Sequence, residues 1–100
     1  MTSDEARSVE AAAQEHLEKA ETHYRAMVRE KHRAVNLWVT AAKRVADRAA
    51  QFRLWSSAAR VVAELPNRNN RELTEEYVRN AINVAPSREA ITELERLVKR

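Results

Sequence analysis

Three histidines have the widest chemical repertoire in this sequence, as metal ligands or proton carriers. His16 and His23 are seven residues apart, and His32 follows nine residues later. On a helix, His16 and His23 would share a face at a separation of about 10 Å along the axis. One metal ion needs ligands a single turn apart, at spacings such as i, i+3 or i, i+4. We therefore expect no metal site and no cofactor in one chain; only a second chain would juxtapose His16 and His23.

Carboxylates and serines give no stronger indication of catalysis. Pairs such as Glu15 with Glu18 and Glu75 with Glu76 are close in sequence. A catalytic pair needs a pocket that shifts the pKa of one member, whereas helical glutamates near Arg and Lys commonly form solvated ion pairs. The chain has no glycine for a phosphate-binding loop, and its serines have no accompanying His and Asp pattern. We predict no catalytic residue and no enzymatic activity.

A basic stretch supports an alternative function. Residues 1–24 are net acidic, residues 25–62 are strongly basic, and the rest is balanced, for a total of +3. A positive stripe along a helix could follow a phosphate backbone. The alternative prediction is therefore a nucleic-acid-binding protein that uses the basic face of residues 25–60, with contacts from Arg25, Arg29, Arg33, Lys43, Arg53 and Arg60. An acidic segment followed by a basic one also favours antiparallel helix pairing, within one chain or between two, and we rank nucleic acid behind that interpretation.

Composition limits the class of protein. One hundred residues, 44% of them hydrophobic and 33% charged, suit a single soluble helical domain over residues 1–100. There is no cysteine, so disulfides and thiolate metal sites are excluded. No apolar run of about 18 residues is present to span a membrane, and the first residues do not resemble a signal peptide. These features leave the localisation unknown.

The absence of glycine is itself unusual, because average usage is about 7%. The sequence leaves open a natural and an engineered or de novo designed origin. A designed chain would add a further alternative function, that of a helical binder of a receptor or another protein target.

One long segment, residues 3–65, dominates the chain. It contains no proline, and its apolar residues recur at alternating steps of three and four. This is the a/d pattern of a coiled-coil seam. The pattern predicts interface or core positions at Leu17, Tyr24, Met27, Trp38, Val45, Phe52, Trp55 and Val62. Lys31 and Arg48 interrupt the seam, and we expect each to extend to solvent or to meet an acid from a partner.

The sequence allows either one helix over 3–65 or two antiparallel helices with a turn near residues 31–36. A tight turn normally contains Gly, Pro, Asp or Ser, and none occurs there. We favour the continuous helix, which would be about 95 Å long at 1.5 Å per residue. Such a helix cannot cover its seam with the remaining residues, so it predicts a homo-oligomer, most simply a dimer.

Two short helices complete the predicted all-α bundle. Pro66 and the asparagines that follow it favour a turn, and a helix over 71–84 and another over 87–99, capped by Ser87, then form an αα-hairpin. The function predicted from these elements is a non-enzymatic helical scaffold or protein–protein interaction module that associates through its seam.

Overall fold

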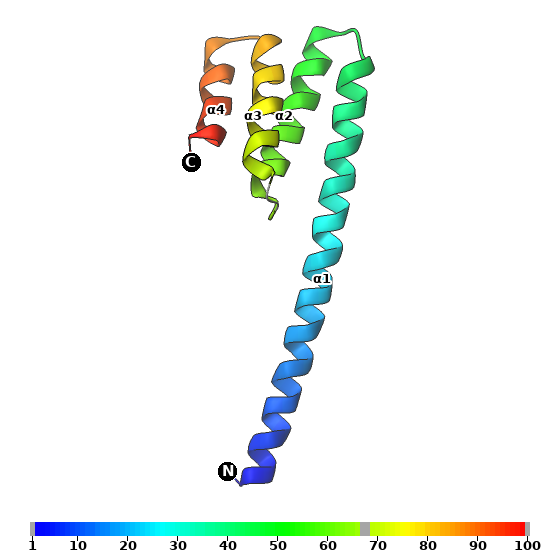
Figure 1. Ribbon diagram of the computed structural model, residues 1–100, viewed down its shortest axis with the longest axis vertical. Coiled ribbons are helices and arrows are strands. Elements are labelled where there is room, and N and C mark those ends of the chain that lie inside the picture. The colour runs from blue at the N-terminus through cyan, green and yellow to red at the C-terminus, as the bar shows by residue number, and fades with distance from the viewer. Residues whose placement is uncertain (1, 67–68, 100) are drawn as a thin grey trace. The chain divides into compact units, whose positions relative to one another are not determined.

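The computed structural model describes residues 2–66 and 69–99, and this part of the chain contains helices and no strand. The predicted all-α architecture is confirmed. Its elements are α1 (Ser3–Arg44), α2 (Arg48–Glu64), α3 (Asn70–Asn83) and α4 (Arg88–Val98) (Figure 1).

The predicted long helix is broken once, at residues 45–47, and no residue there had been predicted as a break. The prediction of a continuous helix over 3–65 is wrong, and so is the alternative turn near residues 31–36, because α1 runs through that segment to Arg44. The break lies at Val45, Ala46 and Asp47. Asp47 has an extended backbone, and its carboxylate accepts a hydrogen bond from the Ala50 N–H at 3.0 Å. This N-cap satisfies one of the free N–H groups at the start of α2 and makes a new helix favourable there.

The C-terminal hairpin has the predicted elements, with bounds that agree within one residue. The Asn70 side chain donates to the carbonyl oxygens of Ala63 and Leu65, so it ties the start of α3 to the end of α2. Ser87 caps α4 as predicted, because its hydroxyl accepts from the Ala90 N–H at 3.2 Å. Local polar side chains thus stabilise the start of each helix of the hairpin, Asn70 at α3 and Ser87 at α4.

The chain divides into two compact units, residues 1–30 and residues 31–100. We call them the N-terminal unit and the C-terminal unit. The boundary lies within α1, between Glu30 and Lys31. The single-domain organisation expected from chain length stays a prediction.

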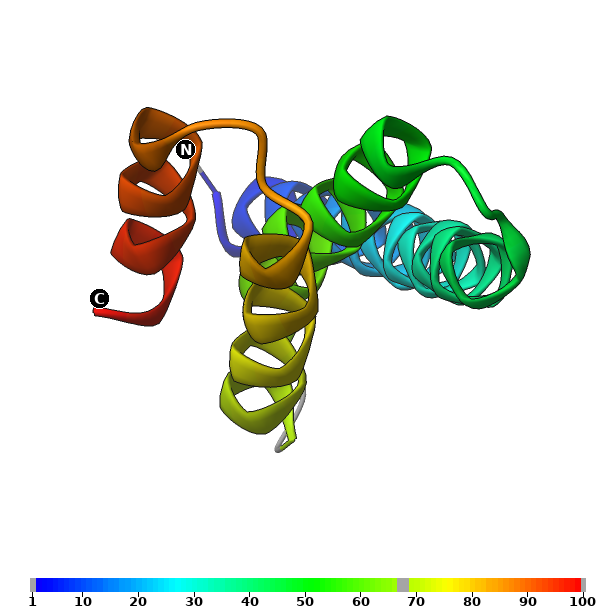
Figure 2. The ribbon, with the colours of Figure 1, turned by 90° about the horizontal axis from the view of Figure 1, so that it is seen from above.

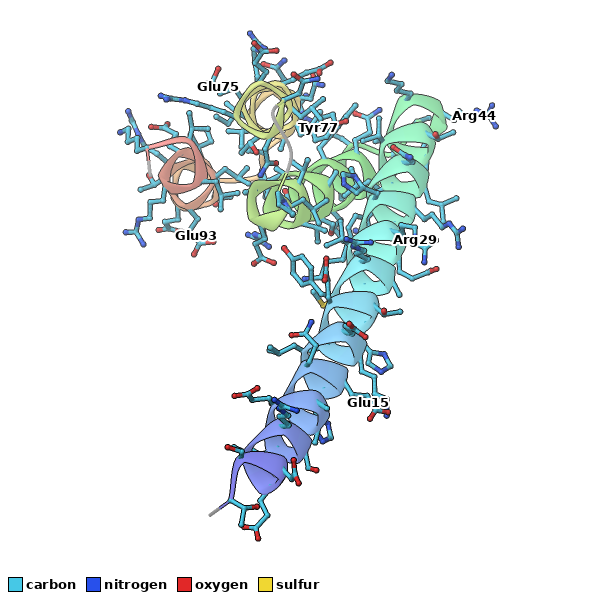
Figure 3. All side chains as sticks on the ribbon, turned by 60° about the horizontal axis from the view of Figure 1, so that its bottom comes forward. Glu15, Arg29, Arg44, Glu75, Tyr77 and Glu93 are labelled. Atoms are coloured by element: carbon cyan, nitrogen blue, oxygen red, sulfur yellow. The ribbon has the colours of Figure 1, made fainter. Side chains whose placement is uncertain are left out.

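The C-terminal unit has a core formed by residues of α2, α3 and α4. In this unit α3 lies between α2 and α4 (Figure 2). Trp55 of α2 packs on Tyr77, whose ring lies on the side of α3 that faces α2, with ring centroids 5.8 Å apart (Figure 3). Small residues allow this close approach: Ala58, Ala59 and Ala81 are fully buried. The largest fully buried side chains are Leu94 and Val62.

The last part of α1, from Lys31 onward, belongs to this core. Val35 and Ala42 are buried, and Lys31 Nζ lies 3.7 Å from Glu64 Oε2 at the end of α2. The acid that Lys31 meets is therefore Glu64 of its own chain, and not an acid from a partner as expected. Arg48, the other charge on the predicted seam, is exposed and donates to the Asn83 carbonyl oxygen at 2.9 Å.

Candidate association surface

The N-terminal unit carries large apolar side chains that remain exposed. Leu17 is 65% exposed, Tyr24 50% and Met27 45%. Together with Ala13 and Ala20 they recur at steps of four and three residues, so they form one face of α1. We call Ala13, Leu17, Ala20, Tyr24 and Met27 the exposed stripe. Val9, 57% exposed, lies near its N-terminal end.

Local interactions account for the helical conformation of this unit. The Glu5 N–H donates to the Thr2 hydroxyl at 3.2 Å, as expected for an N-cap. Ion pairs one turn apart join Glu15 to Lys19 and Glu21 to Arg25. Glu15 projects from α1 toward solvent (Figure 3). Each such pair is worth about 0.2–0.5 kcal/mol, so they support a helix without covering its apolar face.

The remaining seam residues lie in the C-terminal unit and are covered to different degrees. Trp38, Val45 and Phe52 are half-buried, whereas Trp55 and Val62 are buried. The predicted interface or core set therefore separates into two groups at the unit boundary. Leu17, Tyr24 and Met27 are available to another molecule, and the five residues from Trp38 onward are shielded to varying degrees within their own unit.

The three histidines are divided between the two units. His16 and His23 are exposed in the N-terminal unit, and His32 is half-buried in the C-terminal unit. Among residues 2–66 and 69–99, no group of three His, Asp or Glu side chains is arranged to hold a metal ion.

The predicted basic face is divided between the two units. Arg25 and Arg29 belong to the N-terminal unit, and Arg25 is paired with Glu21 at 2.5 Å. In the C-terminal unit, Arg60 lies 3.8 Å from Glu93. Arg29, Arg33, Lys43 and Arg53 are exposed. Nucleic-acid binding through these residues stays a prediction.

A shallow groove between α3 and α4 was not predicted from the sequence. Its volume is about 300 Å³, and its apolar residues are Val78, Ile82 and Val98. Charged and polar residues complete the lining: Glu75, Arg79, Asn83, Glu95 and Lys99. The apolar positions of both hairpin helices are evident in the sequence, but the gap that they leave depends on how the helices pack.

Among the residues that the structure describes, Tyr77 has a clearly shifted pKa. Burial against α2 raises the pKa of its phenol above the usual value of 10.0, and the nearby Glu76 carboxylate adds to the increase. Both effects disfavour the phenolate. They mark Tyr77 as a neutral core residue rather than a proton carrier at neutral pH.

None of the helices in the described part of the chain combines the length and the apolar content needed to cross a membrane. Models of known protein families, curated proteins and solved structures were compared with this chain, and none of them matches it.

Proposed function

We propose that this protein is a non-enzymatic helical interaction module that associates with a second copy of itself through the exposed stripe. The observation that carries the proposal is the exposure of Leu17, Tyr24 and Met27 on one face of a helical unit. Large apolar side chains that gather on one face of a surface helix commonly mark an interaction site.

The N-terminal unit gains most from such a partner. An isolated helix is only marginally stable in water, because helical stability in proteins comes mostly from packing an amphipathic face. The ion pairs and the Thr2 cap stabilise residues 2–30 locally, but the stripe itself is exposed. A partner helix would cover the stripe and stabilise the unit at the same time.

The size of the stripe indicates weak association. Fully burying one large apolar side chain is worth about 1.5–3 kcal/mol, and the three large stripe residues already have about half of their surface covered. Two copies would bury six such side chains, so the gain is roughly 6 kcal/mol or somewhat more, against an association cost of about 4–15 kcal/mol. At the low end of that cost the balance favours the dimer by about 2 kcal/mol, which corresponds to a dissociation constant of tens of millimolar, so we expect dimers only at high concentration.

The test is solution mass as a function of concentration, by sedimentation equilibrium or light scattering. The wild-type mass should rise from the 11.5 kDa of one chain toward twice that value. Leu17→Glu places a charge in the stripe and should abolish the rise. Leu37→Glu is the matched control, since Leu37 is 72% exposed and lies outside the stripe; its dimerisation should equal that of the wild type. A wild-type mass that stays at one chain throughout would overturn the proposal.

A further inference from the structure

We propose that the second copy binds antiparallel, with residues 7–30 of the two α1 helices paired so that Leu17 faces Ala20 of the second copy and Tyr24 faces Ala13 of the second copy. This inference rests on the proposed function and adds the orientation and the register of the pair. Three features of residues 7–30 support it.

The first feature is the charge along these residues. Their first half carries more acid than base, and their second half more base than acid. The first half contains Arg7, Glu10, Glu15 and Glu18, and the second contains Lys19, Glu21, Arg25, Arg29 and Glu30. A parallel pair would place the acidic halves of the two copies side by side, where their like charges repel. An antiparallel pair places each acidic half beside a basic one.

The second feature is the alternation of small and large residues in the stripe from Ala13 to Tyr24. In antiparallel coiled coils, a positions of one helix meet d positions of the other. Leu17 and Tyr24 occupy a positions, whereas Ala13 and Ala20 occupy d positions. Antiparallel pairing therefore sets each of these large side chains against an alanine. In a parallel pair, Tyr24 of one copy would face Tyr24 of the other, and alanine would face alanine. Wide and narrow layers would then alternate along the pair, and such an interface packs less evenly.

The third feature is the residue at which the exposed face of α1 ends. From Lys31 onward the same side of α1 is used within the C-terminal unit, as the Lys31–Glu64 ion pair and the burial of Val35 show. A second helix can therefore use the face only up to about residue 30. Centring the pair between residues 18 and 19 matches residues 7–30 of one copy with residues 30–7 of the other, so each helix uses nearly all of its available face.

The experiment measures one distance between the two copies. The chain has no cysteine, so Ser8→Cys introduces a single spin-label site at an exposed position. In the proposed pair, residue 8 lies opposite residue 29, which is 21 residues from residue 8 of the second copy. Along the axis of the pair these two positions are about 30 Å apart, at 1.5 Å per residue, and the width of the pair adds to this separation. Dipolar spectroscopy at a concentration that gives dimers should therefore find the labels more than about 30 Å apart.

A matched mixture sharpens the test. Ser8→Cys and Arg29→Cys chains, labelled separately and combined, should add a distance shorter than that between two residue 8 labels. Residues 8 and 29 lie at the same level of the pair and both point away from the seam, so only the width of the pair separates their labels. Adding Leu17→Glu to the Ser8→Cys chain should remove the dipolar signal.

The other outcomes contradict the orientation of the pair, its register or dimerisation itself. A dimer in which two residue 8 labels are closer together than a residue 8 and a residue 29 label is parallel, which overturns the orientation and leaves the proposed function standing. A dimer in which the residue 8 and residue 29 labels stay the closer pair, but the two residue 8 labels are about 20 Å or about 40 Å apart along the axis, is antiparallel and shifted by one heptad, which overturns the register. A monomeric mass without a dipolar signal overturns both this inference and the proposed function.

Discussion

The N-terminal and C-terminal units share one heptad pattern in sequence but differ in what covers it. In the C-terminal unit, Trp55 and Val62 are buried against neighbouring helices, and Leu94 of α4 is fully buried. In the N-terminal unit, the seam residues Leu17 and Tyr24 are at least half exposed. Periodicity thus identifies the face of a helix that can be buried, whereas the identity of the element that buries it depends on the rest of the fold or on another molecule.

The largest expected effect contrasts the two units directly. Trp55→Ala should lower the free energy of unfolding by about 3–5 kcal/mol, because it leaves a cavity beside Tyr77 in the core. Leu17→Ala, measured in dilute monomer, should change the same quantity by less than about 0.5 kcal/mol, because Leu17 is exposed. Urea unfolding followed by circular dichroism measures both. Equal losses in the two variants would show that the N-terminal unit has a core partner within its own chain.

A smaller effect is expected at the break that separates α1 from α2. Asp47→Ala removes the acceptor for the Ala50 N–H, and loss of such a cap typically costs about 1 kcal/mol. Asp47→Asn keeps an acceptor oxygen and should retain most of the stability. Urea unfolding measures the free energy of unfolding of both variants. If the alanine variant is as stable as the wild type, the Asp47 cap does not stabilise the start of α2.

The smallest expected effect concerns pH and the core of the C-terminal unit. Because burial raises the pKa of Tyr77 in the folded state, the folded protein holds the phenolic proton more tightly than the unfolded chain does. This contribution to stability is fully present below the unfolded pKa of about 10, and it is lost as the pH rises through the folded pKa. Tyr77→Phe cannot ionise, so its stability should fall less than that of the wild type between about pH 9 and pH 11. Unfolding curves at several pH values measure this difference, and parallel losses would contradict the assigned cause.

The sequence determines much of this fold through local signals. Asn70 and Ser87 have side chains that hydrogen-bond to their own backbone neighbourhood, and Pro66 ends the preceding helix, so the hairpin bounds could be predicted within one residue. The break at residues 45–47 was missed for a physical reason. The heptad phase continues across it, from Trp38 to Phe52, and Asp47 resembles an ordinary surface residue of a longer helix until its capping bond to Ala50 is seen.

The candidate site could be predicted only in part. The apolar positions of the stripe follow from their spacing, but their exposure does not, since Leu17 and Trp55 are both seam residues in the sequence and differ in the structure. Likewise, Val78, Ile82 and Val98 are recognisable as apolar positions, but the groove that they line depends on the spacing between α3 and α4. Burial between elements that are distant in sequence is not encoded by any single segment.

The most direct test of the central claim is residue-resolved hydrogen exchange by NMR at a low and a high protein concentration. If the exposed stripe is the association surface, amides of residues 7–30 should exchange rapidly in dilute solution, because the helix opens locally without a partner. The same amides should slow markedly at high concentration, while amides of α2, α3 and α4 keep the same protection at both. Protection of residues 7–30 that does not change with concentration would contradict the account.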